Sequence, residues 1–241
     1  MNLMNIKSFA ATGLIALGLL ATGCQHQEKM QADSDEWMKH FDVPSDRFTS
    51  VGQSEYFILE PGHQMIYEGE EDDKPARLVI TVLPETKMLD GVETRIVEER
   101  ESAGGKLVEV SRNYFAIDKN THDVYYFGED VDMYKNGEMT GHGGSWHSGE
   151  KGAHYGLFMP AHAEVGQKFY QELAPGEAMD RVEIVSTTMH KKVPAGHFMN
   201  VVKTEETSPL EKGNKEYKLY APGVGLITDG ELELVKYGSG Q

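Results

Sequence analysis

The sequence predicts an all-β protein, an antiparallel meander that forms a curved sheet or an open β-barrel, with a short N-terminal helix. From Tyr56 onward, apolar and aromatic runs of about 6 to 12 residues alternate with breaks that contain glycine, asparagine or aspartate. Several breaks carry the dipeptides of two-residue hairpin turns. Beyond the first 23 residues, no segment shows a long helical period. Together these three observations favour strands joined by tight turns.

The short helix is expected at residues 34–41. Ser34 is a suitable N-cap, and Trp37, Met38 and Phe41 would lie on one side. This segment would begin a single β-rich domain that covers residues 36–241.

The first half of the domain is expected to be a six-stranded meander. Asp90-Gly91 and Asn136-Gly137 tolerate the positive φ angles of a type I′ turn, so each predicts a hairpin. Gly104-Gly105 and the polar residues 118–123 supply further breaks. The predicted strands are 56–67, 77–89, 92–101, 106–117, 123–135 and 138–147.

A stretch rich in glycine, proline and alanine, residues 149–178, interrupts this pattern and is the expected functional loop region. The strand pattern then resumes, with Asp229-Gly230 as a third hairpin dipeptide. The predicted strands of this second half are 181–189, 197–205, 216–220 and 232–237.

The chain begins with the features of a secretion signal, expected to span residues 1–23. Lys7 precedes an uncharged apolar run from Phe9 to Ala21. As a helix this run would be roughly 20 Å long, too short for the roughly 30 Å hydrocarbon core of a bilayer. The segment is therefore expected to direct export and then to be removed.

The chain's one cysteine, Cys24, directly follows the small residues Ala21-Thr22-Gly23. This arrangement resembles the lipobox of bacterial lipoproteins, although leucine is more usual at the position of Ala21. The resemblance implies a covalent lipid at Cys24, and the polar residues 24–35 would form a flexible tether. The alternative is an idle or buried cysteine behind an ordinary signal peptide.

The strongly acidic composition limits the expected partners. The chain has a net charge of −16, and removing residues 1–23 takes away Lys7 and no acid, which leaves −17. Such a surface repels nucleic acid and anionic lipid headgroups. The membrane is therefore an expected partner only through the lipid, and nucleic acid is not expected. The residue directly after the cysteine is Gln25 rather than an aspartate. In a Gram-negative host, this resembles the sorting pattern of outer-membrane lipoproteins.

The last 60 or so residues also carry a resemblance. Residues 193–198, residues 220–226 and the terminal Glu-Leu-Glu-Leu-Val strand resemble the closing hairpins of uncharacterised periplasmic β proteins. Some of these are similar to the lipoprotein-localisation fold, an open barrel with an apolar concave face. The resemblance implies architecture more than activity, because its motifs are turn signals.

A metal site is one hypothesis for function. Glu129, Asp130 and Asp132 are followed by several histidines, and carboxylates with neutral imidazoles bind divalent transition metals. A two-residue turn at Asn136-Gly137 would place Val131 opposite His142 and Tyr126 opposite His147. The histidines concerned are His142, His147, His154 and His162.

Strand alternation then predicts that Glu129 and His142 share one face, whereas Asp130 and Asp132 project from the other. A metal site would need a loop histidine, His154 or His162, beside Glu129 and His142. The alternative is surface ion pairs and solvated histidines. A bulge among the neighbouring glycines would change this register.

No catalytic signature stands out. The glycine-rich residues 141–149 lack the lysine and the strand-to-helix context of a phosphate-binding loop, and a barrel corner with a packed Trp146 explains them equally. A Gly-x-Ser-x-Gly elbow, a His-Glu-x-x-His pair and a calcium loop are all absent from the sequence. Enzymatic activity is therefore not the favoured expectation.

The favoured hypothesis is a binding or carrier module for an apolar ligand or an envelope protein. Tyr125, Phe127, Val131 and Met133 would share one strand face, and Tyr125, Phe127 and Trp146 are the candidate ligand-binding residues. The same side chains would also suit an ordinary core. A structural or assembly lipoprotein that displays its acidic surface to envelope proteins is the alternative. No cofactor is expected besides the lipid, unless the metal hypothesis holds.

Overall fold

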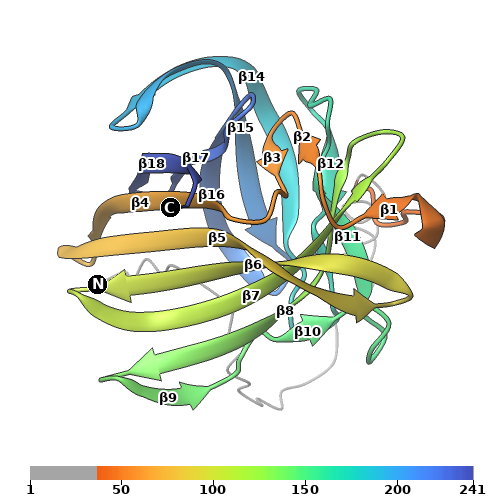
Figure 1. Cartoon of the computed structure of the whole chain (residues 1–241), viewed down its shortest axis with the longest axis horizontal. Coiled ribbons are helices and arrows are strands. Elements are labelled where there is room, and N and C mark those ends of the chain that lie inside the picture. Colours follow the sequence, from red (N-terminus) through yellow and green to blue (C-terminus); the bar gives the residue numbers. More distant parts are fainter. Residues whose placement is uncertain (1–36, 241) are drawn as a thin grey trace, which may run out of the picture.

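The structure is a computed structural model and describes residues 37–240. The expected signal, Cys24, the expected tether and the first part of the expected helix lie outside the described residues. Figure 1 shows long antiparallel strands curling around a common interior. Within residues 37–240, no helix has the length and apolarity needed to span a bilayer.

The first half of the chain forms a meander of five long strands after a short irregular segment. A 3₁₀ turn, Ser45–Arg47, and three two-residue strands, β1 (Phe48–Thr49), β2 (Gln53–Ser54) and β3 (Phe57–Ile58), precede it. The long strands are β4 (His63–Glu71), β5 (Lys74–Leu89), β6 (Val92–Ala103), β7 (Lys106–Asp118) and β8 (Val124–Lys135).

Shorter strands follow, and a second meander completes the chain. The short strands are β9 (Glu138–Gly141), β10 (Trp146–His147), β11 (His154–Met159), β12 (Lys168–Tyr170) and β13 (Glu172–Leu173). The second meander comprises β14 (Arg181–Val193), β15 (Gly196–Ser208), β16 (Glu211–Ala221), β17 (Gly225–Asp229) and β18 (Leu232–Ser239). Antiparallel pairing of β18 with β4 joins the two meanders into one sheet.

Two of the three predicted hairpin dipeptides form the turns that the sequence predicts. Asp90 and Gly91 have φ angles of 49° and 76°, and they connect β5 to β6 with two residues. Asn136 and Gly137 connect β8 to β9 in the same way. The third turn is shifted by one residue, because Asp229 still pairs with Leu232 and the two turn residues are Gly230 and Glu231.

The predicted N-terminal helix is not present in its described part. Met38 forms an isolated parallel bridge with Phe169, and residues 39–44 have no regular structure. Trp37 packs edge-on against Tyr170, with a ring-centroid separation of 6.3 Å. Backbone pairing with the region around β12 therefore takes the place of the local helical hydrogen bonds.

The ends of the sheet meet at Gln171. The path of paired strands begins with β12 and ends with β13, and only Gln171 separates these two strands in the sequence. The Gln171 side chain donates to the Phe158 carbonyl, 2.8 Å away. A Cβ on Gly156 would lie 2.3 Å from the Gln171 carbonyl oxygen, so only glycine permits this approach. The residues expected to be a loop region thus make the seam of an almost closed barrel.

Candidate ligand-binding cavity

The barrel encloses a cavity of about 1010 Å³. Its lining comes from strands of both meanders and from β3, β11 and β13. Ligand cavities in proteins commonly measure about 300–1,000 Å³, so this one has room for a sizeable small molecule.

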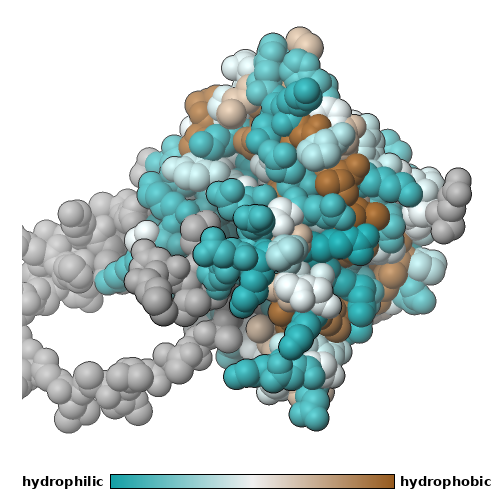
Figure 2. Space-filling view, turned by 90° about the vertical axis from the view of Figure 1, so that its left-hand side faces the viewer, coloured by the Kyte–Doolittle hydropathy of each residue, from teal (hydrophilic) through white to brown (hydrophobic). Residues whose placement is uncertain are grey.

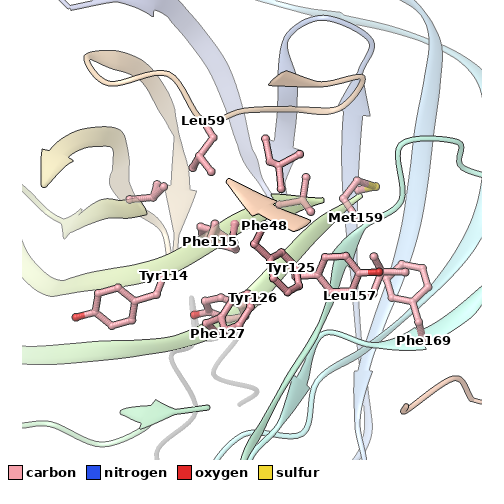
Figure 3. Close-up of a cluster of buried hydrophobic side chains, with 14 of the residues drawn as sticks. Phe48, Leu59, Tyr114, Phe115, Tyr125, Tyr126, Phe127, Leu157, Met159 and Phe169 are labelled. Carbon is pink, nitrogen blue, oxygen red and sulfur yellow. The ribbon is translucent and has the colours of Figure 1, made fainter. Parts of the chain in front are cut away.

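One end of the cavity is lined by an aromatic floor, which we define as Phe57, Phe115 and Phe158. Phe115 lies 4.9 Å from each of the other two rings, measured between centroids, and Phe57 lies 5.4 Å from Phe158. The floor belongs to the larger of two apolar clusters, part of which is shown in Figure 3. These rings offer a water-free surface to any molecule that reaches this depth.

The opposite end carries hydrophilic side chains. Its lining includes the exposed Asp72 and Asp73 in the β4–β5 turn and Asn214 and Lys215 near the start of β16, so the cavity reaches the surface there. We call this end the mouth. Figure 2 views the side of the barrel to which the β4–β5 and β6–β7 turns point, and hydrophilic residues predominate on it.

Between floor and mouth, carboxyl groups surround the interior. They come from β6, β8, β13, the residue before β14, and β15, although these segments are far apart in the sequence. We call this set the carboxyl belt: Glu99, Glu101, Glu129, Glu172, Asp180 and Glu206.

Burial raises the pKa of every member of the belt. Desolvation brings the pKa of Glu99 to about 7, against an opposing effect of Lys218. Desolvation together with the Glu206 charge brings the pKa of Asp180 to about 7 as well. For Glu101, Glu129 and Glu172, burial and then the charges of neighbouring carboxylates hold the pKa well above its usual range. The cavity therefore favours protons or other cations over bare carboxylates.

Little basic charge compensates the belt. Among the described residues that line the cavity, the basic side chains are His63, Lys215 and Lys218. Lys218 Nζ lies 3.1 Å from Glu206 Oε2 and 3.8 Å from Asp229 Oδ2. One interior lysine thus serves two carboxylates on its own side of the barrel.

Three carboxylate oxygens in the belt have no hydrogen-bond partner although they are shielded from solvent. They are Oε2 of Glu101, Oδ1 of Asp180 and Oε1 of Glu206, and Glu101 and Glu206 are 8% and 9% exposed. Glu101 lies directly opposite Glu109 on β7, in the inner wall. A buried polar atom without a partner costs about 1–3 kcal/mol, and more when it is charged. The interior is therefore short of donors.

A β-bulge decides which side chains of β8 enter the cavity. Asn113 pairs with Glu129 and Phe115 with Tyr126, so β8 holds one more residue than β7 between these pairs. Gly128, with φ 137°, permits the bulge, because a Cβ there would lie 2.3 Å from the Trp146 carbonyl oxygen. Tyr126 and Glu129 consequently both line the cavity.

The predicted faces of β8 are wrong because of this bulge. Strict alternation placed Tyr125 and Phe127 on the same side as Val131 and Met133, but the extra residue puts the two pairs on opposite sides. Tyr125 and Phe127 contact Phe48 instead, at centroid separations of 5.4 and 5.2 Å. These two candidate ligand-binding residues therefore lie in a packed cluster outside the cavity lining (Figure 3).

Trp146, the third candidate, is buried and packs edge-on against Tyr126, whose ring lines the cavity. Its backbone lies opposite Glu129. Trp146 thus supports the wall from behind Tyr126, in agreement with the packed barrel corner that the sequence suggested.

The predicted metal ligands Glu129, His142 and His154 do not come together. Glu129 is in the cavity, His142 Nδ1 lies 2.9 Å from Asp132 Oδ1, and His154 is exposed opposite Leu173. Within residues 37–240, no group of three or more His, Cys, Asp or Glu could hold a metal ion. The predicted separation of Glu129 from Asp130 and Asp132 is confirmed, but the register is not, because His147 pairs with Gly128 rather than Tyr126.

Asp130 instead belongs to a charged cluster on the outer face of β8. Asp130 Oδ2 lies 3.0 Å from Lys87 Nζ, Asp130 Oδ1 lies 2.9 Å from His147 Nε2, and Tyr114 donates its hydroxyl hydrogen to Oδ2. Burial raises the pKa of Asp130, but hydrogen bonds from Tyr114 and Lys87 outweigh it, so the pKa lies below its usual value.

The sequence signal for the belt was weak. In an antiparallel sheet with one face in solvent, alternating acidic residues are typical of the solvent-exposed face. The sequence pattern therefore does not distinguish the belt residues from ordinary surface residues. Only the closure of the sheet turns that face inward. No known protein family, curated protein or solved structure matches this chain. The chemistry of the cavity is therefore the guide to function.

Proposed function

We propose that this protein is a lipid-anchored envelope protein whose barrel binds or carries a ligand with a large apolar part. The observation that carries the proposal is the cavity of about 1010 Å³ that ends on the aromatic floor. The secretion signal and the lipobox at Cys24 support the location. In a Gram-negative host, Gln25 favours the outer membrane.

The apolar end of the cavity would make binding of an apolar ligand favourable. Val82, Val97 and Phe115 are each no more than 3% exposed, yet they line the cavity. Transferring apolar ligand surface onto such a wall contributes about 25 cal/mol per Å² removed from water. A carrier must bind its ligand and also release it. The cavity reaches the surface at the mouth, so a bound ligand can leave there.

Binding of a neutral apolar probe tests the proposal. The purified domain without its signal and lipid is titrated with N-phenyl-1-naphthylamine, whose fluorescence increases in apolar surroundings. We expect saturable binding to the wild-type domain. Ile80→Trp adds a large ring inside the cavity and is expected to weaken probe binding at least tenfold.

The matched control is Val79→Trp. Val79 directly precedes Ile80 in β5, so strand alternation directs its side chain to the other face of the sheet. It is expected to leave probe binding unchanged. Equal binding by both variants, or no saturable binding by a folded wild-type domain, would contradict a ligand in the cavity.

A further inference from the structure

We infer that the cavity selects amphipathic cations, with the apolar tail on the aromatic floor and the cationic group among the carboxyl belt. This inference rests on the proposed function and names the chemical class of its ligand. It stands on three structural observations: the order of the linings along the barrel, the unpartnered carboxylate oxygens, and the shortage of interior basic groups.

The order of the linings is visible along single strands. On β7, the inner side chains run from Phe115 through Asn113 and Ser111 to Glu109. On β6, Val97 is followed by Glu99 and Glu101. The wall therefore changes from apolar to acidic in the direction of the mouth. A ligand that enters with its tail first would meet matching chemistry at both ends.

The end of the belt nearer the mouth, where Glu101 faces Glu109, lies at a distance from the floor that suits a long tail. Phe115 and Glu109 are six residues apart, which is about 20 Å along a strand and somewhat less along the axis of a barrel with tilted strands. A long, extended alkyl chain therefore suits this span. A small ammonium ion would satisfy the carboxylates but leave the apolar end unoccupied.

The unpartnered carboxylate oxygens indicate that the head group of the ligand must supply hydrogen-bond donors. Glu101 lines the cavity, is buried, and has no hydrogen-bond donor at its Oε2 atom. Glu206 Oε1 likewise has no partner, although the other oxygen of this carboxylate contacts Lys218. A protonated amine brings hydrogen-bond donors and positive charge to such a site. A carboxylate or phosphate head group would bring only further acceptors and negative charge.

The raised pKa values agree with this geometry. The belt holds protons when no other cation is present, because burial penalises its charged form. An ammonium group would replace part of this proton charge. Binding of an amine should consequently release protons to the buffer.

A series of ligands with one tail and different head groups tests the inference. Dodecylamine, dodecanol and dodecanoate, each below its micelle-forming concentration, compete with N-phenyl-1-naphthylamine at pH 8, and dodecylamine binding is also measured directly by calorimetry. We expect dodecylamine to bind at least tenfold more tightly than dodecanol, and dodecanoate to bind most weakly. Ethylamine, which lacks the tail, is expected not to compete.

Variants of the belt separate charge from packing. Glu101→Gln keeps the size of the side chain and should weaken dodecylamine binding at least fivefold while leaving dodecanol binding unchanged. Glu129→Gln gives a second, independent position if the first variant folds poorly. Glu98→Gln is the matched control, because it removes the same charge from an outward position of β6 that pairs with Arg112. It should change neither affinity.

The outcomes distinguish the two proposals. Equal affinities for amine and alcohol, or tight binding of ethylamine, would overturn the inference about amphipathic cations and leave an apolar ligand standing. An unchanged amine affinity in both belt variants would overturn it as well. A folded wild-type domain that binds neither the probe nor dodecylamine would contradict the proposed function and this inference together.

Discussion

Glu101 of β6 and Glu109 of β7 lie directly opposite each other on the inner wall of the barrel. Side chains that face each other across antiparallel strands come within about 4.5–5.5 Å at their Cβ atoms, and like charges in this position repel. The pair is stable when a proton or another cation lies between the carboxylates. This relationship makes the ligand-free protein sensitive to pH.

The ligand-free protein is expected to be more stable near pH 5 than near pH 8. An acid whose folded-state pKa is raised stays protonated in the folded chain while the unfolded chain has already lost its proton. The free energy of unfolding therefore falls as pH rises from about 4.5 to about 7, the range set by the pKa of Glu99. Urea denaturation at both pH values measures the difference.

Glu101→Gln is expected to reduce this pH dependence. The charges that raise the pKa of Glu101 are those of Glu109 on β7, Glu99 on its own strand, Asp229 on β17 and Glu71 on β4, whereas Lys74 lines a small neighbouring pocket with Glu101. A tenfold change in a protonation equilibrium corresponds to about 1.4 kcal/mol, so the variant should be more stable than wild type at pH 8 by on the order of 1 kcal/mol. An identical slope in wild type and variant would contradict the prediction.

Gly128→Ala is expected to destabilise the domain by about 2–4 kcal/mol. The new methyl group would meet the Trp146 carbonyl oxygen at 2.3 Å, and the backbone at this residue has a φ of 137°. Thermal and urea unfolding measure the loss. Gly141→Ala is the control, because an added Cβ at Gly141 meets nothing within 4 Å. Similar losses for the two variants would show that the bulge does not need glycine.

Lys87→Met is expected to cost less than about 1 kcal/mol, because the ion pair between Lys87 and Asp130 is partly exposed. The lowered pKa of Asp130 contributes stability above pH 3.8 that is lost as the pH falls further. The variant should therefore lose the part of this contribution that comes from Lys87 at neutral pH, while the hydrogen bond from Tyr114 remains, and urea unfolding can measure the loss. Probe binding should be unchanged, and a large change would connect the outer cluster to the cavity.

Cys24→Ser is expected to release the exported protein into the soluble fraction. Without the proposed lipid, the chain would have a strongly negative charge and would be repelled by anionic headgroups. Fractionation of cells that express either form, with a high-salt wash of the membranes, provides the measurement. If the variant stays on the membrane after the wash, another form of attachment must hold it.

Local features of the sequence predicted the strands better than the site. The segments 77–89, 92–101 and 106–117 were placed within a few residues of β5, β6 and β7. By contrast, β17 and the strands of the seam were missed, because short strands in a stretch rich in glycine and proline carry little periodic signal. The candidate ligand residues Tyr125 and Phe127 were placed with the wrong neighbours for a different reason, a single extra residue at the bulge.

The sequence by itself determined where the chain turns and that strands lie between the turns. Asp90-Gly91 and Asn136-Gly137 define hairpins because few other residue pairs adopt two successive positive φ angles at little cost. Only the tertiary structure decided that Glu101, Glu129 and Glu206 share one interior. Their meeting depends on the pairing of β18 with β4, on the seam at Gln171 and on the bulge at Gly128. These are contacts between distant segments, and a local sequence pattern does not encode them.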